Sequence, residues 1–154
     1  MLPTVEFCGL NVTRLIIGAN PFGGYSHQNP ERDQEMRSYY TPERIVETWE
    51  RAWAAGINTM VTNNETPHVI QTTAQYLAGG GPLQWIAQVN LLHETTMEAA
   101  LDQVVEMGCV AAYLHGGYVD RLYEEQDERA LRAHVRHGQS LGMGIGNQPE
   151  DVKR

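Results

Sequence analysis

Lysine is almost absent from this sequence of 154 residues. Ten of the eleven basic residues are arginines, and the one lysine is Lys153. A Schiff base, or an ammonium group that tunes a neighbouring pKa, requires a lysine inside the folded body. Mechanisms of either kind are therefore excluded for this chain alone.

Cysteine is nearly as scarce, and long apolar runs are missing. Cys8 and Cys109 lie far apart without metal or redox spacing, so we interpret both as small buried residues in a reducing compartment. No apolar run approaches the roughly 20 residues of a membrane helix. The first six residues lack the basic start and apolar segment of a signal peptide. We therefore expect a cytoplasmic protein that does not enter a membrane.

Basic charge is low as well. Eleven basic residues stand against nineteen acidic ones, which gives a net charge of -8 and a pI near 5.1. A protein of this sign repels phosphate backbones and anionic lipids, so we expect neither nucleic acid nor a membrane surface as a partner. With 42% apolar residues, the chain is nonetheless able to bury a core without disulfides.

Five apolar runs of strand length alternate with helical patterns. This alternation is typical of βαβ units and a parallel sheet. A short hairpin is expected before the first run, over residues 1–11. The expected strands are residues 12–19, 57–62, 83–89, 109–114 and 143–146.

The helices between these strands carry recognisable start signals. Thr41 and Thr66 each stand before a proline, a pattern that places an N-cap and a first helical residue. Thr95 begins a T-x-x-E capping box, and a fourth helix is predicted from near Asp127 to Leu141. Its two histidines, His134 and His137, are expected on the surface.

Two parallel-sheet architectures compete, an open doubly wound sheet and the first part of a (β/α)8 barrel. The glycines of residues 18–24 do not lead directly into a helix, which weakens a phosphate cradle of the dinucleotide-binding type. Residues 20–41 are instead expected to form a long, lid-like loop. We predict an α/β fold with a TIM-barrel-like parallel sheet, a partial barrel of about five βα units in one incomplete domain over residues 1–154.

Five strands do not close a barrel that needs eight, and the last strand would expose a hydrogen-bonding edge. We therefore expect either a homo-oligomer or a missing C-terminal half-barrel, with a rearranged open sheet as the alternative.

Several short segments resemble successive strands of the aldo-keto reductases and occur in the same order. Residues 85–88 and 115–117 also resemble segments of a group of barrel proteins that are labelled aldo-keto-reductase-like. The segments that carry the resemblance to the reductases are the hairpin with residues 12–18, then residues 54–59, 113–115 and 144–147.

The resemblance implies a nicotinamide cofactor, NAD(P), and a catalytic set of tyrosine, lysine, aspartate and histidine. His115 matches the histidine, and Asn147 matches an asparagine that contacts the nicotinamide amide. The aspartate position falls on Val61, the tyrosine position near Thr66 and the lysine position on Gln88. These three side chains do not supply a tuned acid, so the resemblance does not extend to the complete catalytic set.

Polar side chains follow every predicted strand, where barrel enzymes place their chemistry. His115 follows the fourth strand and precedes two glycines, so we expect its imidazole to project into the mouth of the barrel as an acid, base or ligand. Tyr25 and Tyr118 follow glycine pairs and are candidates for the missing proton donor. The expected substrate-binding residues are Asn20, Asn63, Gln88 and Asn90.

A divalent metal is the alternative to a redox cofactor. Glu65, His68, His93 and His115 form a mixed set of carboxylate and imidazole that suits zinc or manganese, although no HxH or HExxH spacing is present. The sequence thus leaves three functions open. These are an aldo-keto-reductase-like enzyme acting on a polar carbonyl or sugar-like substrate, a metal-assisted isomerase, lyase or hydrolase, and a barrel remnant that binds a ligand or partner without turnover.

Overall fold

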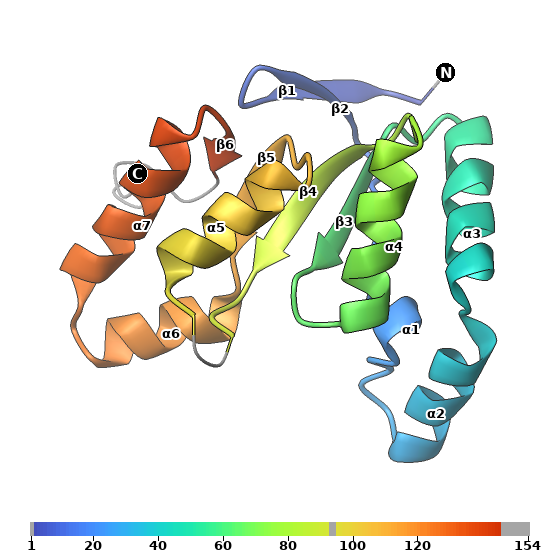
Figure 1. Ribbon diagram of the computed structural model, residues 1–154, viewed down its shortest axis with the longest axis horizontal. Coiled ribbons are helices and arrows are strands. Elements are labelled where there is room, and N and C mark those ends of the chain that lie inside the picture. Colours follow the sequence, from blue (N-terminus) through green and yellow to red (C-terminus); the bar gives the residue numbers. More distant parts are fainter. Residues whose placement is uncertain (1, 93–94, 146–154) are drawn as a thin grey trace.

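A computed structural model describes residues 2–92 and 95–145 (Figure 1). The fold is α/β, as predicted, and its centre is a parallel sheet with the strand order β3-β4-β5-β6. Over the described residues this sheet is open rather than closed into a barrel. None of the described helices combines the length and apolarity needed to cross a membrane. The strands are β3 (Thr59–Asn63), β4 (Gln84–Val89), β5 (Ala111–Leu114) and β6 (Gly144–Ile145).

The predicted hairpin is confirmed. Strands β1 (Thr4–Phe7) and β2 (Leu10–Thr13) pair antiparallel around a turn at Cys8 and Gly9, both of which have a positive φ. The hairpin crosses the amino end of the sheet (Figure 1). It is held there because the carbonyl of Asn11 accepts hydrogen bonds from the side chains of Asn58 and Gln84.

The first predicted strand, residues 12–19, is wrong in its extent. Its first two residues belong to β2, and only Ile17 joins the parallel sheet, through a single bridge to Met60. Thr13 explains the interruption, because its hydroxyl donates to the carbonyl of Leu15 and bends the chain. The chain between Ile17 and Ala19 nevertheless runs beside β3, since Val61 donates its N–H to the carbonyl of Ile17.

Four helices begin close to where the capping signals place them. Thr41 caps α3 (Pro42–Ala54), Thr66 precedes α4 (Pro67–Ala78), and Asp127 caps α7 (Glu128–Ser140). Helix α5 (Met97–Glu106) starts one residue later than the capping box predicts, because Thr96 rather than Thr95 accepts the hydrogen bond from Ala99.

Three further helices were not expected. The segment predicted as a lid-like loop contains α1 (Asn20–Gly23) and α2 (Pro30–Tyr39), and α6 (Gly116–Glu124) follows β5 directly. Helix α2 has no buried residue, so it lacks the apolar stripe from which a helix is usually recognised. Helix α6 starts with two glycines, which are poor helix formers.

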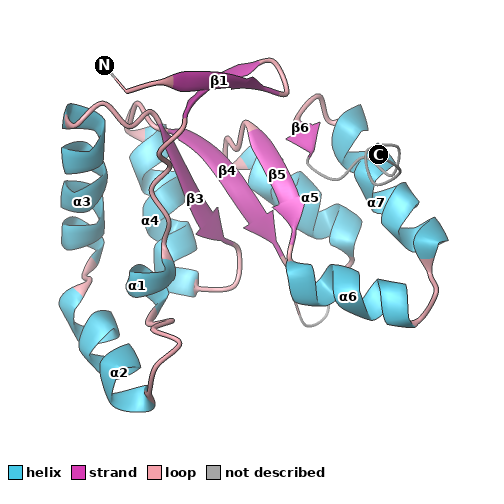
Figure 2. Cartoon of the chain, turned by 180° about the vertical axis from the view of Figure 1, so that it is seen from behind, coloured by secondary structure: helices cyan, strands magenta, loops and turns pink. Residues whose placement is uncertain are grey.

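The hydrophobic core lies between one face of the sheet and the helices. Helices α4 and α5 cover this face in Figure 1, and the strands stand in front of them in Figure 2. Trp85 and Leu101 both belong to this core and have no solvent exposure. Each large apolar side chain buried in this way contributes roughly 1.5–3 kcal/mol. The opposite face of the sheet carries the cavity described below.

The expectation that His134 is a surface residue is wrong, because the residue is buried, with 9% exposure. Its Nδ1 lies 2.7 Å from a carboxylate oxygen of Glu98 on α5, and its Nε2 lies 2.8 Å from the hydroxyl of Tyr118 on α6. His137 makes a parallel contact, 2.7 Å to Asp102. Hydrogen bonds on both ring nitrogens offset the cost of burying the polar ring of His134. The network connects α5, α6 and α7.

Acid should weaken this network. Burial raises the pKa of Glu98, but hydrogen bonds from its own backbone and from His134 outweigh burial and hold that pKa below the ordinary value of 4.5. A carboxylate with a lowered pKa stabilises the fold above its unfolded pKa and loses this contribution as the pH falls through the folded one. We expect Glu98→Gln to reduce the loss of unfolding free energy between about pH 6 and about pH 3.5 in urea titrations. The exposed Glu106→Gln serves as control, and equal acid sensitivity of both variants would contradict this assignment.

Candidate functional site

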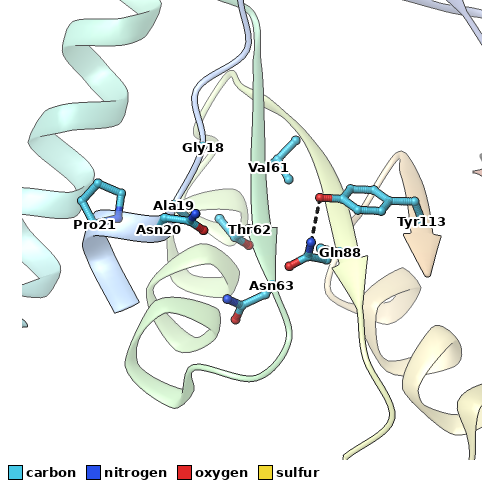
Figure 3. Close-up of a pocket in the computed structure, with 9 residues that line it drawn as sticks. All are labelled: Gly18, Ala19, Asn20, Pro21, Val61, Thr62, Asn63, Gln88 and Tyr113. Atoms are coloured by element: carbon cyan, nitrogen blue, oxygen red, sulfur yellow. Dashed lines mark hydrogen bonds between the residues drawn. The ribbon is translucent and has the colours of Figure 1, made fainter. Parts of the chain in front are cut away.

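A cavity of about 490 Å³ opens at the carboxyl ends of β3, β4 and β5, where parallel sheets commonly bind ligands. Figure 3 shows its lining residues, which come from three strands, the chain beside β3 and helix α1. The lining residues are Gly18, Ala19, Asn20, Pro21, Val61, Thr62, Asn63, Gln88 and Tyr113.

Three polar side chains form a row across this cavity. Asn63 on β3 pairs in register with Gln88 on β4, and Gln88 pairs with Tyr113 on β5. Side chains at the same register position of neighbouring strands point to the same face of a sheet. The sheet therefore aims the three groups into one space, as Figure 3 shows.

Asn63 is fixed by the turn that follows β3. Its side-chain oxygen accepts hydrogen bonds from the backbone N–H groups of Glu65 and Thr66, at 3.0 and 3.1 Å. The oxygen is thereby committed to the loop. Within the described residues its amide nitrogen has no partner, so Asn63 offers two N–H donors to the cavity.

Gln88 and Tyr113 are joined by a hydrogen bond. The side-chain nitrogen of Gln88 donates to the Tyr113 hydroxyl at 3.1 Å (Figure 3). Burial raises the pKa of Tyr113, and the hydrogen bond from Gln88 lowers it by less, so the phenol is neutral at physiological pH.

The lining carries no full charge at neutral pH. None of the nine described lining residues is an aspartate, glutamate, histidine, lysine or arginine. An anionic or cationic ligand therefore finds no counter-ion among them. Amide and hydroxyl groups on a partly apolar wall suit a neutral polar molecule instead.

The other two predicted substrate-binding residues differ in their surroundings. Asn20 lines the cavity from α1, and its amide nitrogen donates to Nε2 of His27 at 3.3 Å. Asn90 lies just after β4 and donates to Glu65 at 2.8 Å, while its backbone N–H donates to Asn64. Asn90 thus supports the loops beside the cavity rather than lining it.

The candidate histidine and the two candidate tyrosines have structural partners. Nδ1 of His115 accepts from the backbone N–H of Gly117 at 3.1 Å, so the ring turns back to cap α6 instead of projecting freely into the mouth. The Tyr118 hydroxyl is buried against His134, as described above. Tyr25 is exposed and hydrogen-bonds Thr66 at 3.2 Å.

Three of the four expected metal ligands lie among the described residues, and each contacts a different partner. Nε2 of His68 donates to the carbonyl of Phe22 at 2.9 Å, Glu65 accepts from Asn90, and His115 caps α6. No group of three histidine, cysteine, aspartate or glutamate side chains able to hold a metal occurs in the described ranges. His93 and the expected cofactor residue Asn147 lie outside the described residues.

Tyr113 and Thr62 are polar lining residues that sequence reasoning did not propose as site residues. The sequence placed Tyr113 in the expected strand 109–114, but not its register beside Gln88, which turns both side chains to the cavity face of the sheet.

No protein-family model matches the chain, and no curated protein matches it.

The turn-capping role of Asn63 is testable by stability alone. We expect Asn63→Ala to lower the free energy of unfolding by about 1 kcal/mol, because two backbone N–H groups lose their acceptor. Asn63→Asp keeps the accepting oxygen and should retain the stability of the parent protein. Urea unfolding measures both variants. An Asn63→Asp protein as unstable as Asn63→Ala would refute the turn-capping role.

Proposed function

We propose that the chain forms part of an aldo-keto-reductase-like (β/α)8 barrel and binds a polar carbonyl or sugar-like small molecule at the carboxyl ends of its strands. The observation that carries this proposal is the uncharged row of Asn63, Gln88 and Tyr113 facing one cavity. Turnover of that molecule is the enzymatic form of the proposal, and binding without turnover is its simpler form.

The order of the strands supports the barrel part of the proposal. The spatial order of the strands is the same as their order along the chain: the bridge at Ile17, then β3, β4, β5 and β6. A doubly wound sheet would instead reverse direction at one point in this order. Helices α4 and α5 cover the same face. A barrel has this one-sided arrangement because its other face is the interior.

The same proposal expects further strands to complete the sheet, supplied by a second copy or by a C-terminal half-barrel. Within the described part, β6 pairs with β5 alone and leaves its other edge open. Open edges of this kind favour association. The molar mass in solution, measured by light scattering, distinguishes a self-associating chain from a monomer.

The nicotinamide cofactor implied by the family does not fit the residues described here. Its phosphates need cationic partners, and the described lining has none. The positions of the family's aspartate and lysine hold Val61 and Gln88. The polar chemistry of the site therefore comes from its own amide and hydroxyl groups.

A pair of ligands that differ in charge tests the binding proposal. We expect D-fructose to bind and fructose 6-phosphate to bind at least about tenfold more weakly, because the phosphate lacks a counter-ion in the cavity. Chemical-shift titration by NMR measures both dissociation constants.

Asn63→Asp provides the matched variant, since it keeps the turn but replaces two N–H donors with a negative charge. We expect it to weaken fructose binding about tenfold or more. Gln139→Glu, an equivalent charge change on the exposed side of α7, should have no effect. Equal binding of the two ligands, or no binding of either, would refute the proposed site.

A further inference from the structure

Tyr113 lines the cavity beside Gln88, with which it pairs in register. It comes from β5, lines the cavity, and reaches over the neighbouring strand so that its hydroxyl contacts Gln88 (Figure 3). Tyr113 is half-buried, and part of its surface lines the cavity. The family resemblance assigns no function to this tyrosine.

The direction of the hydrogen bond decides what Tyr113 offers. Gln88 is the donor, and the phenol oxygen is the acceptor. The proton of Tyr113 is therefore not used by Gln88, and no other described residue accepts it. Because the phenol is neutral, this O–H group is a hydrogen-bond donor facing the cavity.

Gln88 supplies the complementary group. Its nitrogen is engaged by Tyr113, and within the described residues its side-chain oxygen has no partner. The cavity thus presents a donor, the Tyr113 hydroxyl, beside an acceptor, the Gln88 oxygen. A molecule with a carbonyl next to a hydroxyl matches this pair, since a carbonyl oxygen only accepts and a hydroxyl also donates.

We infer that Tyr113 donates a hydrogen bond to the carbonyl oxygen of an α-hydroxycarbonyl ligand, while Gln88 orients the Tyr113 hydroxyl and accepts from the adjacent ligand hydroxyl. Tyr113 polarises the carbonyl, and Gln88 is its positioning residue. This inference rests on the proposed function and specifies the class of its ligand.

The open-chain ketose erythrulose, labelled with ¹³C at the carbonyl, is a suitable probe. We expect it to bind, and we expect Tyr113→Phe to weaken binding about tenfold, the effect of one lost hydrogen bond. The infrared stretch of the bound carbonyl should shift to higher frequency in Tyr113→Phe, because the carbonyl is no longer polarised. A merely structural tyrosine would not move this frequency. Tyr123→Phe, at an 84% exposed position, is the matched control.

Gln88→Glu tests the positioning step. A carboxylate accepts the Tyr113 proton, so the phenol is turned away from the ligand although Tyr113 is still present. We expect the same upward shift of the carbonyl stretch as in Tyr113→Phe. Gln139→Glu should leave the stretch unchanged. Thermal unfolding confirms that each variant is folded before its spectrum is compared.

The outcomes separate this inference from the proposed function. If fructose binds but erythrulose does not, or if erythrulose binds Tyr113→Phe with unchanged affinity and carbonyl frequency, the inference is wrong and the proposed function stands. If fructose does not bind the parent protein, the proposed function fails, and the inference that rests on it fails with it.

Discussion

The parallel backbone pairing of β3, β4 and β5 is the constraint on which the site depends. Parallel hydrogen bonds set the register, and register sets which side chains share a face. A slip of one residue on β4 would turn Gln88 toward the helices and bring an apolar neighbour into the cavity. The apolar layer opposes such a slip, because Trp85 would have to leave the core. Core packing on one face therefore holds the polar row in place on the other.

The two faces of β4 have different roles: one packs in the core, and the other carries the polar side chains. Trp85, Ala87 and Val89 are buried against the helices, whereas Gln84 and Gln88 lie on the opposite face at its two ends. Gln84 holds the hairpin at the amino end, and Gln88 faces the cavity at the carboxyl end. Ile86 lies between them, so the polar groups at the two ends of this strand are separated by apolar surface. This arrangement separates Gln88, which faces the cavity, from Gln84, which holds the hairpin.

Much of the fold was predictable because its signals are local. The threonine-proline pairs that open α3 and α4, and the alternation of apolar runs, depend only on neighbouring residues. The errors arose where distant residues decide the outcome. His134 lies between the apolar positions Leu131 and Val135 of α7, and only the partners from α5 and α6 make its burial tolerable. The sequence named only part of the cavity lining, because local signals do not give the register between strands. Asn20, Asn63 and Gln88 follow from strand ends, but Tyr113 needs the register between β4 and β5.

The near absence of lysine gives the site its chemical character. An ammonium group beside a phenol lowers the phenol's pKa and favours release of its proton. Gln88 stands beside Tyr113 instead, and an uncharged amide donor only partly offsets the rise in pKa that burial causes. Tyr113 therefore holds its proton firmly and acts as a hydrogen-bond donor rather than as a readily ionised acid. Since no described lining residue carries a charge, this donor is not screened by a nearby ion, and its effect on a neutral carbonyl is strengthened by the partly desolvated surroundings.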